Sequence, residues 1–130
     1  VYASSQEPEM KDKSVTILNK AVELDPNDAE SLLFLAIIDT EAGNLDAAEA
    51  KFEKITELYP ESEKAYFFLG RLFYEKGDYA AAEASYKKAL EINPGFGSAL
   101  VELAIVYEQQ GRMKESEQIY RYVIVLYPNS

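Results

Sequence analysis

The chain has 130 residues, of which 23 are acidic and 13 are basic, so its formal net charge is -10. An acidic chain repels phosphate backbones, and we therefore expect no nucleic-acid partner. Because cysteine and histidine are both absent, disulfides, thiol nucleophiles and imidazole bases are excluded, and we expect neither a cofactor nor a metal site. No apolar run approaches the roughly 20 residues of a membrane span, so no direct membrane insertion of this segment is expected.

Apolar residues recur at helical spacing along almost the whole chain, and no segment has the alternation of a strand. In one stretch Tyr66, Leu69, Gly70 and Phe73 stand at i, i+3, i+4 and i+7, which places them on one helix face. Proline or glycine follows each such pattern and ends it. The sequence therefore predicts an all-α fold of about seven helices, near residues 12–24, 29–42, 45–58, 63–76, 79–92, 97–110 and 113–126.

A period of 34 residues organises these helices. It separates four of the five prolines, which are Pro26, Pro60, Pro94 and Pro128. It also separates three glycines, Gly43, Gly77 and Gly111, which stand where a helix terminus of positive φ is expected. Three units of two helices each follow, at residues 29–62, 63–96 and 97–130, and residues 1–28 are left over.

The middle unit carries a family pattern most completely. Its matching positions are Tyr66, Leu69, Gly70, Phe73, Gly77, Ala82, Tyr86, Ala89 and Pro94. In this period and pattern the chain resembles the tetratricopeptide repeat (TPR) family. The resemblance implies a right-handed superhelical solenoid of antiparallel helix pairs that binds other proteins. Asp39 stands where the family prefers tyrosine and Ser116 where it prefers alanine, so we expect weaker contacts between helices at both positions.

Residues 1–28 fit the same register as the remnant of a preceding repeat. We expect its second helix near 12–24, a connecting loop at 6–12 and the last turn of its first helix at 1–4. The chain is thus expected to be one continuous solenoid domain, the soluble segment of a longer protein. The absence of cysteine suits the cytoplasm and the bacterial periplasm equally, so the compartment stays open.

The resemblance also implies that the first helices of the repeats line a concave groove. Positions facing this groove form an apolar strip with few charges: Leu33, Phe34, Ile37, Phe67, Phe68, Arg71, Tyr74, Val101, Glu102 and Ile105. We assign Phe67, Arg71 and Tyr74 to the groove, whereas Phe34 and Phe68 could equally pack between helices. Arg71 could bind a ligand or pair with Glu102 or Glu75. A carboxylate clamp, as some family members use, is not expected, because the matching positions lack its cations.

The leading hypothesis is a protein-interaction scaffold, not an enzyme, that captures a peptide or helix of a partner protein in this groove. The competing hypothesis is a structural module that forms a homodimer through uncapped solenoid ends. The residues expected at that end are Tyr122, Val125, Leu126 and Tyr127.

Overall fold

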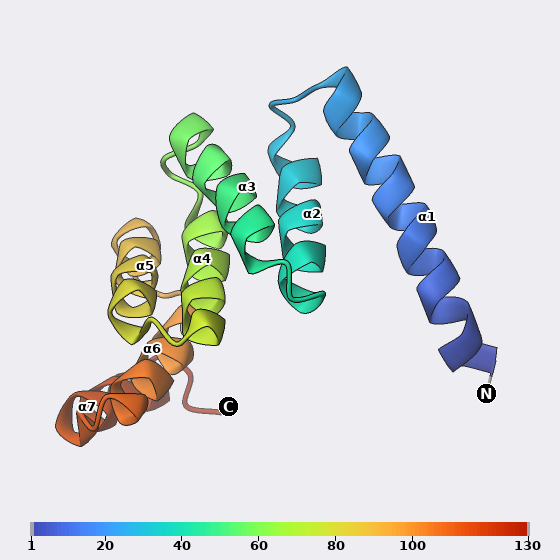
Figure 1. The fold of residues 1–130 in the computed structure, drawn as a ribbon. Coiled ribbons are helices and arrows are strands. Elements are labelled where there is room, and N and C mark those ends of the chain that lie inside the picture. Colours follow the sequence, from blue (N-terminus) through green and yellow to red (C-terminus); the bar gives the residue numbers. More distant parts are fainter. Residues whose placement is uncertain (1, 130) are drawn as a thin grey trace. The chain divides into compact units, whose positions relative to one another are not determined.

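A computed structural model describes the backbone of residues 2–129 and the side chains of residues 12–129. Within these residues the fold is all-α, with seven helices and no strand (Figure 1). The helices are α1 (Tyr2–Leu24), α2 (Ala29–Glu41), α3 (Leu45–Leu58), α4 (Glu63–Lys76), α5 (Tyr79–Ile92), α6 (Gly97–Gln109) and α7 (Met113–Leu126). From α2 onward each helix agrees with its predicted range to within one residue.

The first helix differs from its prediction. α1 begins at Tyr2, so its bounds extend through the segment where a loop at residues 6–12 was expected. The expected last turn at residues 1–4 and this loop fall largely on residues 1–11, whose side chains are outside the described residues. The part predicted as a second helix, 12–24, is helical as expected.

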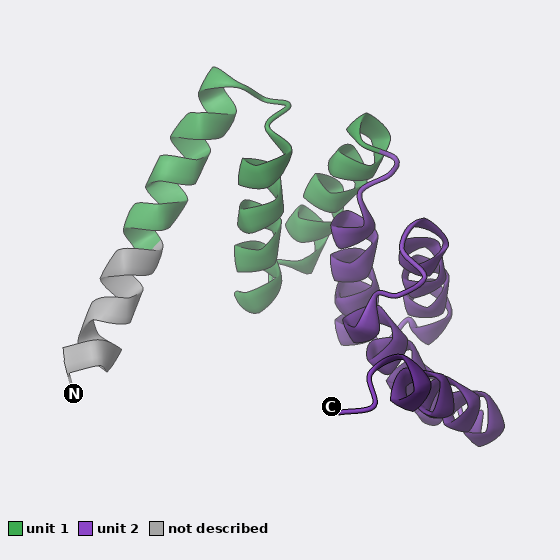
Figure 2. Cartoon of the chain, turned by 180° about the vertical axis from the view of Figure 1, so that it is seen from behind, with its two compact units in different colours: residues 1–59 green, residues 60–130 purple. Residues whose placement is uncertain are grey.

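The chain divides into two compact units, residues 1–59 and 60–130 (Figure 2). The division lies within a few residues of a predicted repeat boundary, so unit 1 holds α1 to α3 and unit 2 holds α4 to α7. Within the units, α2 packs on α3, α4 on α5, and α6 on α7, as pairs of neighbouring helices. One continuous solenoid over all three repeats stays a prediction.

Local sequence explains where the helices of unit 2 begin and end. The hydroxyl of Ser62 accepts a hydrogen bond from the Ala65 amide at 3.3 Å, and Asp78 Oδ1 accepts one from the Ala81 amide at 3.1 Å. Both are N-caps that satisfy a free amide of the first turn. α4 ends at Lys76 and is followed by Gly77, whose φ of 80° is left-handed. Gly43 and Gly111 have similar φ values, as the period predicted.

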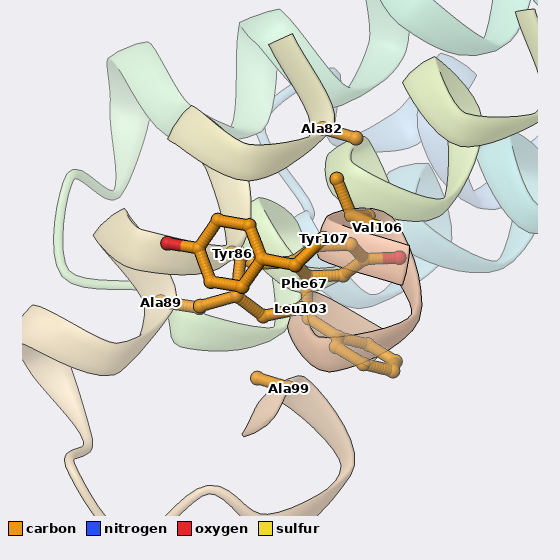
Figure 3. Close-up of a cluster of buried hydrophobic side chains, with 8 residues drawn as sticks. All are labelled: Phe67, Ala82, Tyr86, Ala89, Ala99, Leu103, Val106 and Tyr107. Carbon is orange, nitrogen blue, oxygen red and sulfur yellow. The ribbon is translucent and has the colours of Figure 1, made fainter. Parts of the chain in front are cut away.

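The core of unit 2 forms where α4, α5 and α6 meet (Figure 3). Its buried residues are Phe67, Ala82, Tyr86, Ala89, Ala99, Leu103, Val106 and Tyr107. Tyr86 of α5 is fully buried and lies against the backbone of α4 at Gly70. A Cβ atom at Gly70 would stand 2.5 Å from Cε1 of the Tyr86 ring, so only glycine permits this separation of the two helices.

The core of unit 1 lies between α2 and α3. Its buried hydrophobic residues are Leu32, Leu35, Ala36, Ala48, Phe52 and Ile55. Tyr59 follows α3, and its hydroxyl donates a hydrogen bond of 2.7 Å to the carbonyl oxygen of Asn27, in the loop before α2. The same bond recurs in unit 2, where the Tyr127 hydroxyl donates to the Gly95 carbonyl. These bonds join the end of a second helix to the loop that precedes its own helix pair.

Candidate protein-binding surface

α4 and α6 are adjacent first helices of unit 2, and several residues predicted to face the groove lie on them. Arg71 Nε is 3.8 Å from Glu102 Oε1, so an ion pair joins the two helices. Glu102 also accepts a hydrogen bond of 3.4 Å from the hydroxyl of Tyr86. We call the surface around this pair the α4–α6 face. It is defined by Phe68, Arg71, Tyr74, Val101, Glu102 and Ile105.

Electrostatics at this face are set by one cation and one carboxylate. The side chain of Arg71 is 52% exposed and that of Glu102 is 29% exposed, so the pair is open to solvent and to a ligand. Burial of Tyr86, followed by the nearby charge of Glu102, raises the pKa of the Tyr86 hydroxyl far above its ordinary value. Tyr86 therefore remains a neutral donor that helps to orient Glu102.

Phe67 does not line this face. It is only 7% exposed, and its ring stacks on Phe96 with the centroids 5.0 Å apart. It also contacts Tyr86 at 5.8 Å and Phe68, edge to face, at 5.2 Å. Phe67 is therefore a core residue, and its assignment to the groove was wrong. The covering ring comes from the loop before the next repeat, which helix periodicity within α4 could not reveal.

The remaining apolar positions of the face are partly exposed. Phe68, Tyr74, Val101 and Ile105 are each of intermediate burial. The Tyr74 ring lies 5.4 Å from that of Tyr79, at the start of α5, so part of it packs within the helix pair. The face therefore combines the Arg71–Glu102 ion pair with partly exposed apolar side chains of α4 and α6.

The other predicted groove residues are in unit 1. There, Leu33 and Ile37 are of intermediate burial, whereas Phe34 is 47% exposed. They lie along α2, at the spacing of one helix face. Because they belong to a different unit from the α4–α6 face, a strip that continues across three repeats stays a prediction.

A hollow of about 400 Å³ lies between the start of α6 and the end of α7. Its lining residues are Gly97, Ser98, Val101, Glu102, Val123 and Tyr127. Val101 and Glu102 were predicted for the groove and Tyr127 for the solenoid end, so the hollow joins two predicted surfaces. From the sequence, Gly97 and Val123 were not assigned to a binding surface. The 34-residue register could have indicated them, because they correspond to Glu63 and to the buried Ala89 of the preceding repeat.

Comparison with known proteins now decides the family. The model described as "Tetratricopeptide repeat" matches three overlapping segments, residues 12–63, 35–96 and 69–130. The chain belongs to the tetratricopeptide repeat family. Its fold is accordingly the helical solenoid fold of a protein–protein interaction scaffold.

Solved structures agree with the TPR fold. "Crystal structure of MamA" is 25% identical, with a TM-score of 0.79, and the match covers 88% of this chain and 67% of that one. "Crystal structure of MamA protein" is 24% identical, with a TM-score of 0.80, and the match covers 96% and 69%. A search of curated proteins finds no match.

The two departures from the TPR pattern are offset by polar contacts. The Lys51 ammonium of α3 donates to the carboxylate of Asp39 in α2, where the family prefers tyrosine. In unit 2 the buried hydroxyl of Ser116 donates to Glu108 Oε1 at 3.1 Å, so that α6 and α7 remain joined. The expected weakening is thus opposed by a hydrogen bond at each position.

Nothing within the described residues adds a metal site or a membrane span to this TPR segment. No group of three or more acidic side chains is placed to hold a metal ion there. Likewise, none of the described helices is both long enough and apolar enough to cross a membrane.

Proposed function

We propose that the protein is an interaction scaffold, without catalytic activity, that holds a peptide or helix of a partner protein against the α4–α6 face. The carrying observation is the half-exposed Arg71–Glu102 pair, which sits on two adjacent first helices among partly exposed apolar side chains. Aromatic and arginine side chains are the usual anchors of protein interfaces. Because the ion pair is long and solvated, either residue can leave the other and pair with a charge of the ligand at a small cost in free energy.

This proposal excludes a carboxylate clamp as the mode of binding. Arg71 already has a carboxylate beside it, and Glu102 would repel a second one. We therefore expect ligands that combine apolar side chains with a basic or neutral polar group near Glu102. Phe67 supports the face from beneath and is not itself a contact.

A quantitative pull-down from cell extract tests the α4–α6 face. We compare the wild type with an Arg71→Ala, Tyr74→Ala double variant and with Lys88→Ala, a matched control on α5 whose ammonium pairs with Glu91 at 3.3 Å. The double variant is expected to lose partners that the control retains. Circular dichroism verifies that all three chains are folded. Identical sets of partners would contradict the proposal.

Self-association through the end of α7 is the competing function. It is supported by the exposure there of Tyr122 (44%), Val125 (76%), Leu126 (38%) and Tyr127 (40%). Light scattering separates the two functions. A dimer that dissociates on dilution and is abolished by Leu126→Glu supports self-association, whereas a monomer at all concentrations contradicts it.

A further inference from the structure

Within unit 2, α6 covers a well-defined surface of α5. Ala82, Tyr86 and Ala89 of α5 are fully buried, in a cluster with the α6 residues Leu103 and Val106 (Figure 3). This interface shows which apolar pattern a helix needs in order to pack on the second helix of a repeat. The covering face has the pattern Ala-x3-Leu-x2-Val-Tyr, from Ala99 to Tyr107.

A preformed ion pair borders this interface and contacts the tyrosine of the covering helix. Glu83 and Lys87 pair on α5 at i, i+4, with Lys87 Nζ 2.7 Å from Glu83 Oε2. The hydroxyl of Tyr107 donates to Glu83 Oε2 at 3.3 Å, and Lys87 Nζ lies 5.9 Å from the Tyr107 ring centroid. Arg112, which follows α6, lies closer to the same ring, at 4.4 Å, and pairs with Glu83 at 2.7 Å. One carboxylate thus binds the hydroxyl of Tyr107, and two cations contact its π face.

The Glu83–Lys87 pair itself recurs 34 residues later on α7, where it is exposed. Glu117 and Arg121 pair at i, i+4, with Arg121 Nη2 2.6 Å from Glu117 Oε1. The side chain of Glu83 is 15% exposed, whereas those of Glu117 and Arg121 are 61% and 77% exposed. The charges and their spacing are therefore repeated one period later, on a more exposed surface.

Apolar residues on α7 complete the correspondence. Tyr120 and Val123 stand one period after the buried Tyr86 and Ala89, and both are of intermediate burial. Val123 also lines the hollow of about 400 Å³, whose other wall is the first turn of α6. By contrast, Tyr122 and Val125 correspond to Lys88 and Glu91, which are exposed on α5 although α6 follows. From this correspondence we expect Tyr122 and Val125 to lie outside the docking surface.

We propose that the surface formed by Glu117, Tyr120, Arg121, Val123 and the adjoining hollow binds an amphipathic helix of a partner protein that carries a tyrosine. The tyrosine occupies the register of Tyr107, within an Ala-x3-Leu-x2-Val-Tyr stripe. Two observations select this occupant: the surface continues, one period on, the interface between α5 and α6, and the charges of Glu117 and Arg121 complement a phenol hydroxyl and its ring. The hollow shares Val101 and Glu102 with the α4–α6 face, but Glu117, Tyr120, Arg121 and Val123 lie outside that face.

A labelled peptide with the sequence of residues 96–112 is the direct probe, because it supplies the helix that covers the equivalent surface of α5. Its binding to the full chain is measured by fluorescence anisotropy. We expect a dissociation constant of about 1–100 μM, since a free peptide of this length loses conformational entropy on becoming helical. A Tyr107→Phe version of the peptide should bind roughly fivefold more weakly, through loss of one hydrogen bond to a carboxylate.

Variants of the chain test where the peptide binds. Val123→Asp should abolish binding of the peptide. Glu117→Ala should weaken binding of the native peptide roughly fivefold and leave the affinity for the Tyr107→Phe peptide unchanged. Lys88→Ala is the control and should have no effect. Circular dichroism and thermal melts establish that the variants are folded.

Four outcomes would overturn this proposal. They are no binding up to about 1 mM peptide; affinity that Val123→Asp and Glu117→Ala leave unchanged; loss of binding with Arg71→Ala alone, which would place the peptide on the α4–α6 face; and a dimer in light scattering that Val123→Asp abolishes while the peptide fails to bind. Because Arg71 and Tyr74 lie outside this surface, and Glu117 and Val123 lie outside the α4–α6 face, failure of one proposal leaves the other measurable.

Discussion

Replacement of Gly70 by alanine isolates the closest helix contact in unit 2. The added Cβ would lie 2.5 Å from Cε1 and 2.7 Å from both Cδ1 and Cζ of Tyr86. Carbon atoms normally approach to about 3.5–4.0 Å, so the ring or the helix must move by about 1 Å. The Tyr86 ring is fully buried and hydrogen-bonded to Glu102, and it has little room to yield.

Two opposing effects determine the size of the change. Overpacking a core costs about 1–3 kcal/mol, and a clash with a buried aromatic ring belongs at the upper end of that range. Alanine gains about 1 kcal/mol over glycine in helix propensity. The free energy of unfolding should therefore fall by about 2 kcal/mol, which lowers the melting temperature by about 6–10 °C for a chain of this size.

Urea unfolding followed by circular dichroism measures the effect of Gly70→Ala. Gly95→Ala is the matched control, because its Cβ would meet only Asn93 and Tyr127 atoms at 3.8 and 3.9 Å, and stability should hardly change. In a Tyr86→Leu background the cost of Gly70→Ala should shrink, since the ring is gone. An increase in stability on Gly70→Ala would refute the reasoning, because it would mean that helix propensity outweighs the clash.

Two further predictions concern unit 2. Gly77→Ala should lower the free energy of unfolding by about 1 kcal/mol, because its φ of 80° is strained for alanine even though no atom lies within 4 Å of the new Cβ; a urea midpoint equal to that of the wild type would contradict this. Glu83→Gln should lower stability most at neutral pH. Burial raises the pKa of Glu83, but hydrogen bonds from Lys87 and Arg112 outweigh it, so the net shift is downward from 4.5. The ionised carboxylate therefore stabilises the fold above about pH 4.5, and this contribution is lost as the pH falls through the lowered pKa; urea midpoints at several pH values measure it, and a difference between wild type and variant that does not vary with pH would speak against this account.

Helix positions and turn glycines could be predicted from the sequence because local physics determines them. Three features predicted the bounds of α2 to α7 to within one residue. They are the 34-residue period, the helical spacing of apolar residues, and the glycines and prolines that follow the helices. Gly70 is one of the positions that match the family pattern, and the 2.5 Å approach of Tyr86 gives the physical reason for a glycine there. The segments that match the family model, residues 12–63, 35–96 and 69–130, include these helices and glycines.

The exposure of individual site residues could not be predicted in the same way. Helical spacing indicates the face of the helix on which a residue lies. It does not indicate whether side chains of a neighbouring repeat cover that residue. The ring of Phe67 is covered by Phe96, which lies in the loop before α6. The hydroxyl of Ser116 in α7 donates a hydrogen bond to Glu108 in α6. The sequence by itself thus determined the family, through its 34-residue period, and it determined α2 to α7 and the glycine turns, because helix ends and turns depend on neighbours a few residues apart. Only the tertiary structure decided which side chains remain available for binding, because burial depends on contacts between residues far apart in the chain.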